Sequence, residues 1–435
     1  MKLFKRTRKL SKAKLLTCFG CMVVPILAVI LLAIDFTIAN RPVILNIPTP
    51  AMPAVNARDD FLKAGALAKK MVHHSMSNSP KPETYKLADF AACAVDAEPV
   101  IAALRAGFLK PFMEPPQRSS ATVSNSIQDY GVYRNIEREL TGAATHFDMI
   151  GKPGRATQIR LDGMELGVMI EHGGGLITSL VSSACVSMSA PGLEDQLPLL
   201  SSEELIAVSN RLDHIQSKLV DYRSVAGEEE NLILVMFKEF VNVRSNPQER
   251  FQVYRSIVHS SDDDSLRPKD ITGWFGFEFE NKRELAEKIK KYYKDLIVEM
   301  GDVYHKQSRT SMNGNFYLQS FCNYSFSGWG KHLAVQSRID LLRLEVALLR
   351  FKADNHKFPT TLVELSPKYL KSIPVDPLDS NKPYKYQLKP DGTYLLYGLR
   401  PDMVDHHGTT MEVGEDKGFD LVAGHLARKV KLPTK

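Results

Sequence analysis

One stretch near the start of the chain limits what the chain can become. Leu15 to Ile34 is a run of twenty residues without a charge, rich in Leu, Ile and Val. A helix of that length spans roughly 30 Å, the thickness of the hydrocarbon core of a bilayer. A cleaved secretory signal has a shorter apolar region, roughly 7–15 residues, followed by a small-x-small site that "DFTIANRP" lacks. We therefore predict an uncleaved single-pass transmembrane anchor, residues 15–34.

The charges on either side of this run predict its orientation. Residues 1–14 contain seven basic residues and no acidic one, which predicts a cytoplasmic tail and a body on the far side of the membrane. The expected location is a bacterial inner membrane, with the bulk of the protein periplasmic or otherwise extracytoplasmic. Without the tail, the chain has 49 basic and 50 acidic residues. A body with this balance has no electrostatic reason to bind nucleic acid, and we expect none.

The next segments predict a spacer and then a helical domain. Residues 35–56 contain four prolines and are expected to form an extended spacer, and residues 57–301 a mainly α-helical exported domain. Asn56, Ser201 with Glu204, and Asn281 are expected to cap helices. Apolar residues then recur at steps of three and four, which predicts one buried face for each helix. These residues are Phe61, Ala64, Met71, Leu205, Val208, Leu212, Ile215, Leu219, Leu285, Ile289, Tyr292 and Leu296.

A second uncharged stretch lies in the interval from Gly163 to Gly192. It contains three consecutive glycines and several serines, and its Leu and Ile content is modest. Small residues let helix backbones approach one another closely. We therefore predict a buried helix here, in close contact with its neighbours, and no second membrane span.

The last quarter of the chain changes character. Residues 302–330 are rich in Ser, Asn and Gly and are predicted to be a linker, followed by a C-terminal domain, residues 331–435. Its first helix should pack Ile339, Leu342, Val346 and Leu349 against two strands. These strands are predicted from the alternation in "YKYQL" and "YLLYG" and are joined by a turn at Pro390-Asp391-Gly392.

Four segments, in this order, resemble the globular domain of the type II secretion major pseudopilins and related type IV pilin-like proteins. They are "LLRFKADNHKFPTTLVEL", "VDPLDSNKPYKYQ", "GTYLLYGLRPD" and "GEDKGFDL". The resemblance implies a long helix packed on a small antiparallel sheet. The expected fold class is thus α+β: a single transmembrane helix, a helical exported domain and a pilin-like domain.

The chain departs from that family at its start. Pseudopilins have a short leader, a Gly–Phe cleavage site and a Glu five residues into the mature helix, whereas here Gly20 is followed by Cys21. The predicted anchor also lies about 300 residues before the pilin-like helix. We therefore do not expect a processed, filament-forming pseudopilin.

The resemblance also implies a metal site. Major pseudopilins bind calcium in a C-terminal loop, and four aspartates approximate the acidic positions there: Asp402, Asp405, Asp416 and Asp420. Calcium takes six to eight oxygen ligands. His406-His407 and the insertion "TTMEV" depart from the family loop, so an unliganded polar loop is the alternative.

Two function classes remain open. The first is a membrane-anchored binding or scaffold protein without an assigned reaction, whose partners are envelope proteins of the secretion or related machinery. The second is an exported hydrolase with a cleft in the helical domain near Glu171 and His172. Adjacent residues on a helix point about 100° apart, so these two side chains are not expected to converge on one atom.

Overall fold

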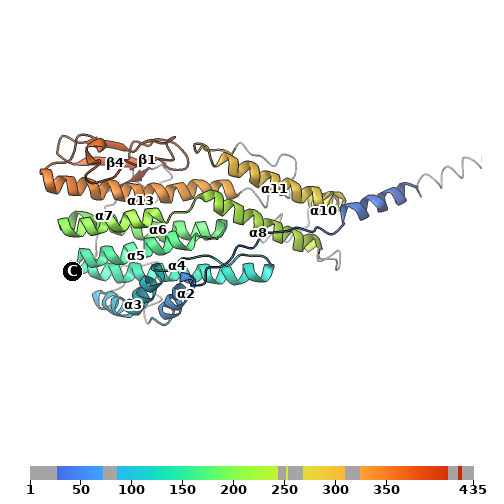
Figure 1. Ribbon diagram of the computed structural model, residues 1–435, viewed down its shortest axis with the longest axis horizontal. Helices are drawn as coiled ribbons and strands as arrows, with labels where there is room; N and C mark the ends of the chain where they lie inside the picture. Colours follow the sequence, from blue (N-terminus) through green and yellow to red (C-terminus); the bar gives the residue numbers. More distant parts are fainter. Residues whose placement is uncertain are drawn as a thin grey trace, which may run out of the picture.

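The computed structural model describes residues 27–71, 86–242, 251–252, 268–308, 324–409 and 420–423. Most of the long helices lie side by side in an elongated body, and a small β module covers one side of it (Figure 1). The chain is mainly helical with a small antiparallel sheet, so the α+β class is confirmed at that level. The helices are an apolar helix Leu27–Ala39, α2 (Ala57–Ala68), α3 (Leu87–Phe108), α4 (Ser120–Met149), α5 (Pro153–Ile170), α6 (Leu176–Gln196), η3 (Leu197–Leu199), α7 (Ser202–Ser217), α8 (Tyr222–Asn242), α10 (Pro268–Phe279), α11 (Lys282–Glu299), α13 (Tyr324–Asn355) and η4 (Leu362–Leu365). The strands are β1 (Val375–Asp376), β2 (Lys382–Pro383), β3 (Lys385–Leu388), β4 (Tyr394–Gly398) and β5 (Leu421–Val422).

Local signals determine where several helices begin. At α2 the side chain of Asn56 accepts a hydrogen bond from the backbone N–H of Arg58. Ser201 and Glu204 form a reciprocal capping box at α7, and Asn281 caps α11. Each cap satisfies a backbone N–H that has no partner within the first turn. The expected inward faces are buried, with Leu219 partly so.

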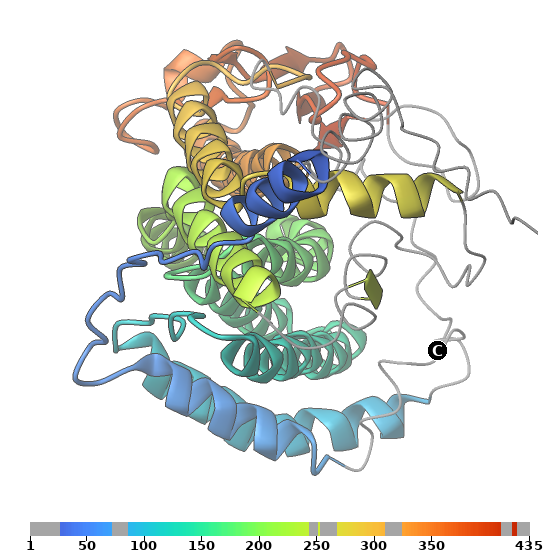
Figure 2. The same ribbon diagram turned by 90° about the vertical axis from the view of Figure 1, so that its right-hand side faces the viewer.

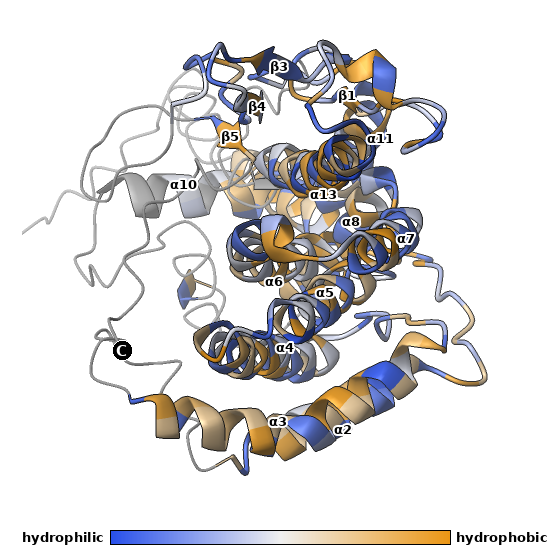
Figure 3. Ribbon diagram, turned by 90° about the vertical axis from the view of Figure 1, so that its left-hand side faces the viewer, coloured by the Kyte–Doolittle hydropathy of each residue, from blue (hydrophilic) through white to orange (hydrophobic). Residues whose placement is uncertain are grey.

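The helices stack in layers that end-on views separate. The α2–α3 pair is outermost, α4, α5 and α6 with α7 follow, and α13 lies between them and the β module (Figures 2 and 3). One apolar core joins α2 through α6 and includes Phe61, Leu104 and Tyr133. A second joins α5, α6 and α7 to α13, around Met164, Leu193 and Leu212.

The interval from Gly163 to Gly192, whose second half is uncharged, is largely buried, as predicted, but it forms parts of two helices. α5 ends at Ile170 and α6 begins at Leu176, with the glycine run forming the turn between them. Gly173 has φ +76°, a conformation that a side chain disfavours. Among the described residues, Leu176–Leu199 is the one helical segment long and apolar enough to cross a membrane, and more than half of its window is buried inside the protein.

The long helix α13 is buried on two opposite faces, which corrects the predicted packing. Ile339, Leu342 and Val346 contact the helical body in the core shared with α6 and α7. Leu341 and Leu344 belong instead to the core under the β module, together with Ala347, Leu348 and several aromatic residues of the module. The predicted stripe therefore faces the helices, and a neighbouring stripe faces the strands.

The β module has the predicted central hairpin. β3 pairs antiparallel with β4, with Tyr386 opposite Leu396 and Leu388 opposite Tyr394. β5 adds to the other edge of β4, and β1 with β2 forms a separate two-stranded sheet. Buried Asp376 accepts hydrogen bonds from the backbone N–H groups of Leu378 and Leu399, which connects the two sheets.

Two predicted boundaries differ from the structure. α13 begins at Tyr324, inside the predicted linker 302–330, of which residues 309–323 lie outside the described residues. The spacer 35–56 is extended over most of its length, but it is not free. Val43 is buried in the core around α8 and α11, and its backbone N–H and C=O both bond the side chain of Asn242, each at 3.1 Å.

Candidate functional site

The acidic loop after β4 has internal partners for its aspartates. Asp402 accepts hydrogen bonds from the backbone N–H of Val404 and from His406 Nε2, both at 3.3 Å. Asp405 accepts from Tyr397 Oη at 3.1 Å and from the backbone N–H of His407 at 2.8 Å. These bonds connect side chains and backbone within the described part of the loop.

The two carboxylate oxygens of Asp420 differ in their surroundings. Its Oδ2 accepts a hydrogen bond from Gly408 N–H at 2.8 Å, while its buried Oδ1 has no partner among the described residues. Burial raises the pKa of Asp420, and the charge of Asp405 raises it further. Asp416 lies outside the described residues. Within the part of the chain that the structure describes, no group of three or more His, Cys, Asp or Glu side chains is arranged to hold a metal. The calcium site therefore stays a prediction.

Glu171 and His172, the residues of the hydrolase hypothesis, point to different partners. Glu171 follows the last turn of α5 and is 1% exposed; its Oε1 lies 2.9 Å from His332 Nδ1 on α13. His172 Nε2 lies 2.7 Å from the carbonyl oxygen of Lys218 and donates to it. The adjacent pair does not form a site, as expected from the geometry of a helix.

The partner that the sequence did not reveal is His332. It is 4% exposed, and its ring lies 5.3 Å from that of Tyr222. A carboxylate accepts hydrogen bonds, so Nδ1 of His332 carries a proton and, in the neutral ring, Nε2 is left as an acceptor. His332 also lines a pocket of about 340 Å³ at the meeting point of α8, α13, the residues after α11 and the β1–β2 turn.

This pocket combines aromatic and polar side chains. Tyr222, Tyr304 and Trp329 line it together with Arg223 and Gln336. Its described lining residues include no Ser, Thr or Cys that could serve as a nucleophile. A histidine held by a buried carboxylate can still act as a general base toward a water molecule. The pocket can bind a small polar molecule, and His332 can accept a proton from a water molecule bound there.

A separate ionic network lies inside the helical body. Asp162 and Glu165 of α5 are almost fully buried and face three cations: Arg105, Arg211 and Lys218. Burial raises the pKa of Asp162, and the two arginines oppose that shift. Each carboxylate has at least two cationic partners, so the network joins α3, α5 and α7 and needs no ligand to neutralise it.

Glu137 of α4 is another buried carboxylate, and its hydrogen-bond partners are hydroxyl groups. Its Oε1 accepts hydrogen bonds from Ser189 Oγ at 2.5 Å and from Thr141 Oγ1 at 3.5 Å. Burial raises the pKa of Glu137 to about 8. A Cβ atom at Gly163 would lie 1.9 Å from its Oε2, so this glycine provides the space that the carboxyl occupies. The arrangement favours a neutral carboxyl group.

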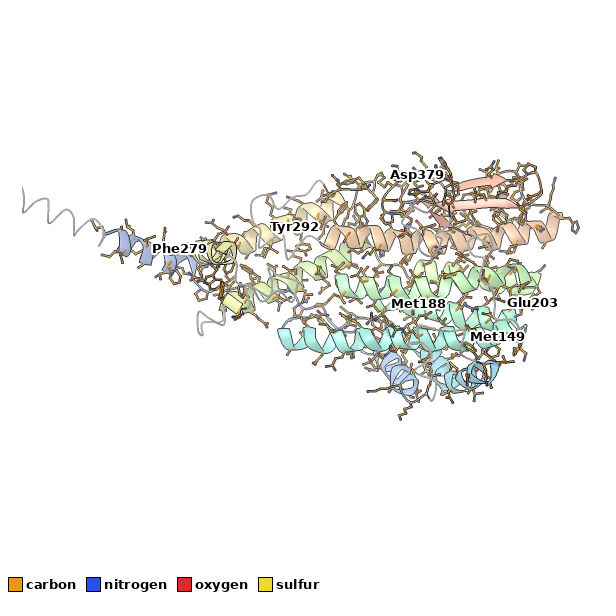
Figure 4. All side chains as sticks on the ribbon, turned by 180° about the vertical axis from the view of Figure 1, so that it is seen from behind. Met149, Met188, Glu203, Phe279, Tyr292 and Asp379 are labelled. Carbon is orange, nitrogen blue, oxygen red and sulfur yellow. The ribbon has the colours of Figure 1, made fainter. Side chains whose placement is uncertain are left out.

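The remaining candidate is the apolar helix Leu27–Ala39, part of the predicted anchor; residues 1–26 lie outside the described residues. It projects from one end of the body, where it meets α10 (Figures 1 and 4). Phe36 packs edge-to-face on Phe279 with ring centroids 5.6 Å apart. Asn40 Nδ2 donates to the carbonyl oxygen of Glu278 at 2.8 Å. These two contacts connect the helix to α10.

Comparison with known proteins gives no relative: no family model, no curated protein and no solved structure matches this chain.

Proposed function

We propose that this chain is a membrane-anchored extracytoplasmic binding or scaffold protein of the bacterial envelope, held by its N-terminal helix with the N-terminus in the cytoplasm. One observation carries the proposal. The helix Leu27–Ala39 leaves the body with its apolar side chains open to the surroundings on all sides. Eight large apolar side chains between Leu27 and Ile38 are 37–64% exposed.

Such a helix needs an apolar environment. A helix that is hydrophobic all round is stable inside a protein core or a membrane. The described residues do not form a protein core around this helix. It continues the uncharged run that begins at Leu15 behind seven basic residues. A bilayer would cover these side chains, and the basic tail would stay on the cytoplasmic side.

The binding role is supported by the surface of the body. The pocket beside His332 offers a place for a small partner molecule. We expect the partners among secretion or envelope proteins, because four C-terminal segments resemble pilin-like domains.

Cell fractionation tests the anchoring directly. The full chain with a C-terminal tag should remain in the membrane after an alkaline wash, and mass spectrometry should recover peptides from residues 1–40. Protease added to spheroplasts should digest the body while the tail stays protected. A soluble mature chain that begins near Asn40 would disprove the proposal.

The second candidate function, an exported hydrolase, has a specific observation in its favour: the Glu171–His332 pair beside a pocket. It predicts that the purified full chain hydrolyses a member of an ester and amide panel. The activity should be lost in His332→Gln and kept in His172→Gln, because His172 lies on another hydrogen bond. Equal loss in both variants, or none in either, would remove this candidate.

A further inference from the structure

The helix α10 lies where the helix Leu27–Ala39 leaves the body. Its axis runs across the long axis of the body, since the end-on view of Figure 3 shows α10 lengthwise. The helix Leu27–Ala39 points mainly along that long axis (Figure 1). The two helices meet through the rings of Phe36 and Phe279, 5.6 Å apart, and through the hydrogen bond that Asn40 donates to α10. A bilayer that holds the first helix would therefore have its surface roughly parallel to α10.

Large apolar side chains are exposed around this junction, and we call them the collar: Phe36, Ile38, Ile44 and Phe279. Phe279, the last residue of α10, is 45% exposed, and Ile44, in the extended segment after the first helix, is 87% exposed. A single exposed apolar residue is common, whereas several at one place indicate an interaction surface. Full burial of such a side chain contributes about 1.5–3 kcal/mol, so the collar favours an apolar partner.

Ile44 is held at the same end of the body as α10. Its neighbour Val43 forms two backbone hydrogen bonds with Asn242, the last residue of α8. Phe240 of α8 packs on Phe277 of α10, with ring centroids 5.3 Å apart. The end of α8 therefore connects Ile44 to α10, and the collar lies at the base of the helix Leu27–Ala39.

The carbonyl groups at the end of α10 have a protein partner. Lys282 is 1% exposed. Its Nζ donates to the carbonyl oxygens of Phe277, Glu278 and Glu280, the last two at 3.2 Å and 2.9 Å. Carbonyl groups near hydrocarbon need such internal partners, because lipid tails offer no hydrogen bond. The corner between α10 and α11 therefore suits a position next to lipid.

From these observations we infer that α10 and the collar lie in the interfacial layer of the bilayer that holds the proposed anchor. Interfacial helices place Trp and Phe at this depth, and residues 273–279, "GWFGFEF", have four aromatic residues in seven positions. The partner of this surface is a lipid bilayer and not a second protein. The inference rests on the proposed anchor and adds a second membrane contact, which would fix the orientation of the body on the membrane.

Quenching of tryptophan fluorescence by brominated lipid tests this contact in the full chain. The chain has two tryptophans, and Trp274→Phe with Trp329→Phe removes both. Phe279→Trp or Ile44→Trp then introduces one reporter, and the protein is placed in nanodiscs of phosphatidylcholine brominated near the head group or near the chain ends. We expect each reporter to lose at least about half of its fluorescence with the shallow bromine and less with the deep one, because interfacial helices lie about 5–10 Å into the head-group boundary.

Two further reporters in the same background are the controls. Leu27→Trp lies nine residues before Phe36, about 14 Å deeper along the helix, so the deep bromine should quench it more strongly. Val298→Trp, at a position of α11 that is 70% exposed, lies roughly 24 Å along that helix from Lys282, and neither lipid should quench it. Circular dichroism checks that each variant is folded.

The controls keep the two proposals apart. Quenching of Leu27→Trp without quenching at the collar would disprove the interfacial contact and leave the anchor standing. Quenching at the collar without quenching of Leu27→Trp would disprove the anchor alone. Equal quenching of Val298→Trp and the collar reporters would overturn the inference. So would a collar covered by a second copy of the chain, which would show no dependence on bromine.

The wild-type chain gives an independent measurement if the tryptophan-free background does not fold. A phospholipid with a diazirine on its acyl chain near the head group should label peptides that cover residues 41–47 and 273–283. The peptide that covers residues 291–300 is the internal control and should stay unlabelled. Labelling of the helix Leu27–Ala39 alone would contradict the interfacial contact.

Discussion

Two apolar helical segments of this chain have opposite surroundings. The helix Leu27–Ala39 extends from the end of the body (Figure 1). Its side chains are largely exposed. α6 lies inside the body between α5 and α13, and Val181, Cys185, Val186 and Leu193 are buried there. Both segments are apolar enough to be considered as candidate membrane helices. Apolarity by itself therefore does not decide which of them meets lipid.

The small and polar residues of α6 make the difference. A Cβ atom at Gly167 would lie 3.0 Å from Cys185 Cβ, so α5 and α6 approach closely. Ser189 bonds Glu137 of α4, and Thr178 bonds Tyr130 of the same helix. The exposed helix consists mainly of Leu, Val, Ile and Ala, whereas α6 also contains several Ser residues and a Gly. Small residues and hydroxyl groups favour packing of α6 against other helices, whereas the branched aliphatic residues of the helix Leu27–Ala39 favour contact with lipid.

The largest expected effect is that of a charge in α6. Val186→Asp places an unpaired carboxylate at a position that is 1% exposed, so it should destabilise the fold by about 4 kcal/mol or more and prevent accumulation of folded protein. Thermal unfolding followed by circular dichroism measures this. Ser187→Asp, one residue on and exposed, is the control and should unfold within a few degrees of the wild type. A normal unfolding temperature for Val186→Asp would mean that α6 is not in the core.

A charge in the other helix should have a different result. Leu27→Asp should make membrane insertion less favourable by about 3 kcal/mol, and the unfolding temperature of the body should not change. Alkaline extraction of membranes measures the fraction released, with Leu27→Ala as the control. If Leu27→Asp instead destabilises the body and leaves membrane retention intact, the helix is a packing element and not an anchor.

Ser189 of α6 donates a hydrogen bond to Glu137 of α4, and this carboxyl group should make the stability of the fold depend on pH. In the folded protein its pKa is about 8, against an ordinary value of 4.5, so the folded state keeps a proton that the unfolded chain releases. Its contribution to stability therefore decreases as the pH rises from about 4.5 to 8.

The variant Glu137→Gln cannot ionise. It should match the wild type near pH 4 and be more stable than the wild type near pH 9, as measured by denaturant unfolding at both values. Glu203→Gln, at an exposed position of α7, is the matched control and should show no such difference. A stability gain for Glu137→Gln that is the same at both pH values would exclude the ionisation mechanism.

The smallest expected effect concerns the junction below the exposed helix. Asn242→Ala removes both hydrogen bonds to the backbone of Val43, with a loss of about 1 kcal/mol for each. Hydrogen exchange of the peptide covering residues 41–47 should accelerate, while α6 keeps its protection. Asn210→Ala, on the exposed side of α7, is the control. Unchanged exchange in the peptide would show that other contacts hold this segment.

Local sequence signals predicted much of the helical structure. The caps at Asn56, Ser201 and Asn281 and the hairpin at Asp391-Gly392 depend on neighbours within a few residues, and the structure contains them. The two stripes of α13 show the limit of such signals. Periodicity identified Ile339, Leu342 and Val346 as buried, but a helix covered on two sides has two apolar stripes, and spacing does not say which partner each one meets.

The candidate site at Glu171 likewise depends on a contact between residues that are far apart in the sequence. Glu171 stood out in the sequence, but its partner His332 lies 161 residues away, and a single histidine on an apolar helix carries no local sign of that pairing.

By itself the sequence determined the helical periods, the caps, the hairpin and the uncharged N-terminal run, since these depend on backbone bonding and on side chains a few residues apart. The tertiary structure decided which apolar face is covered and by what. It also decided which carboxylate meets which cation or imidazole, and where the extended segment around Val43 docks. Such contacts join residues distant in the chain, so their free energy depends on packing of the whole body and not on local composition.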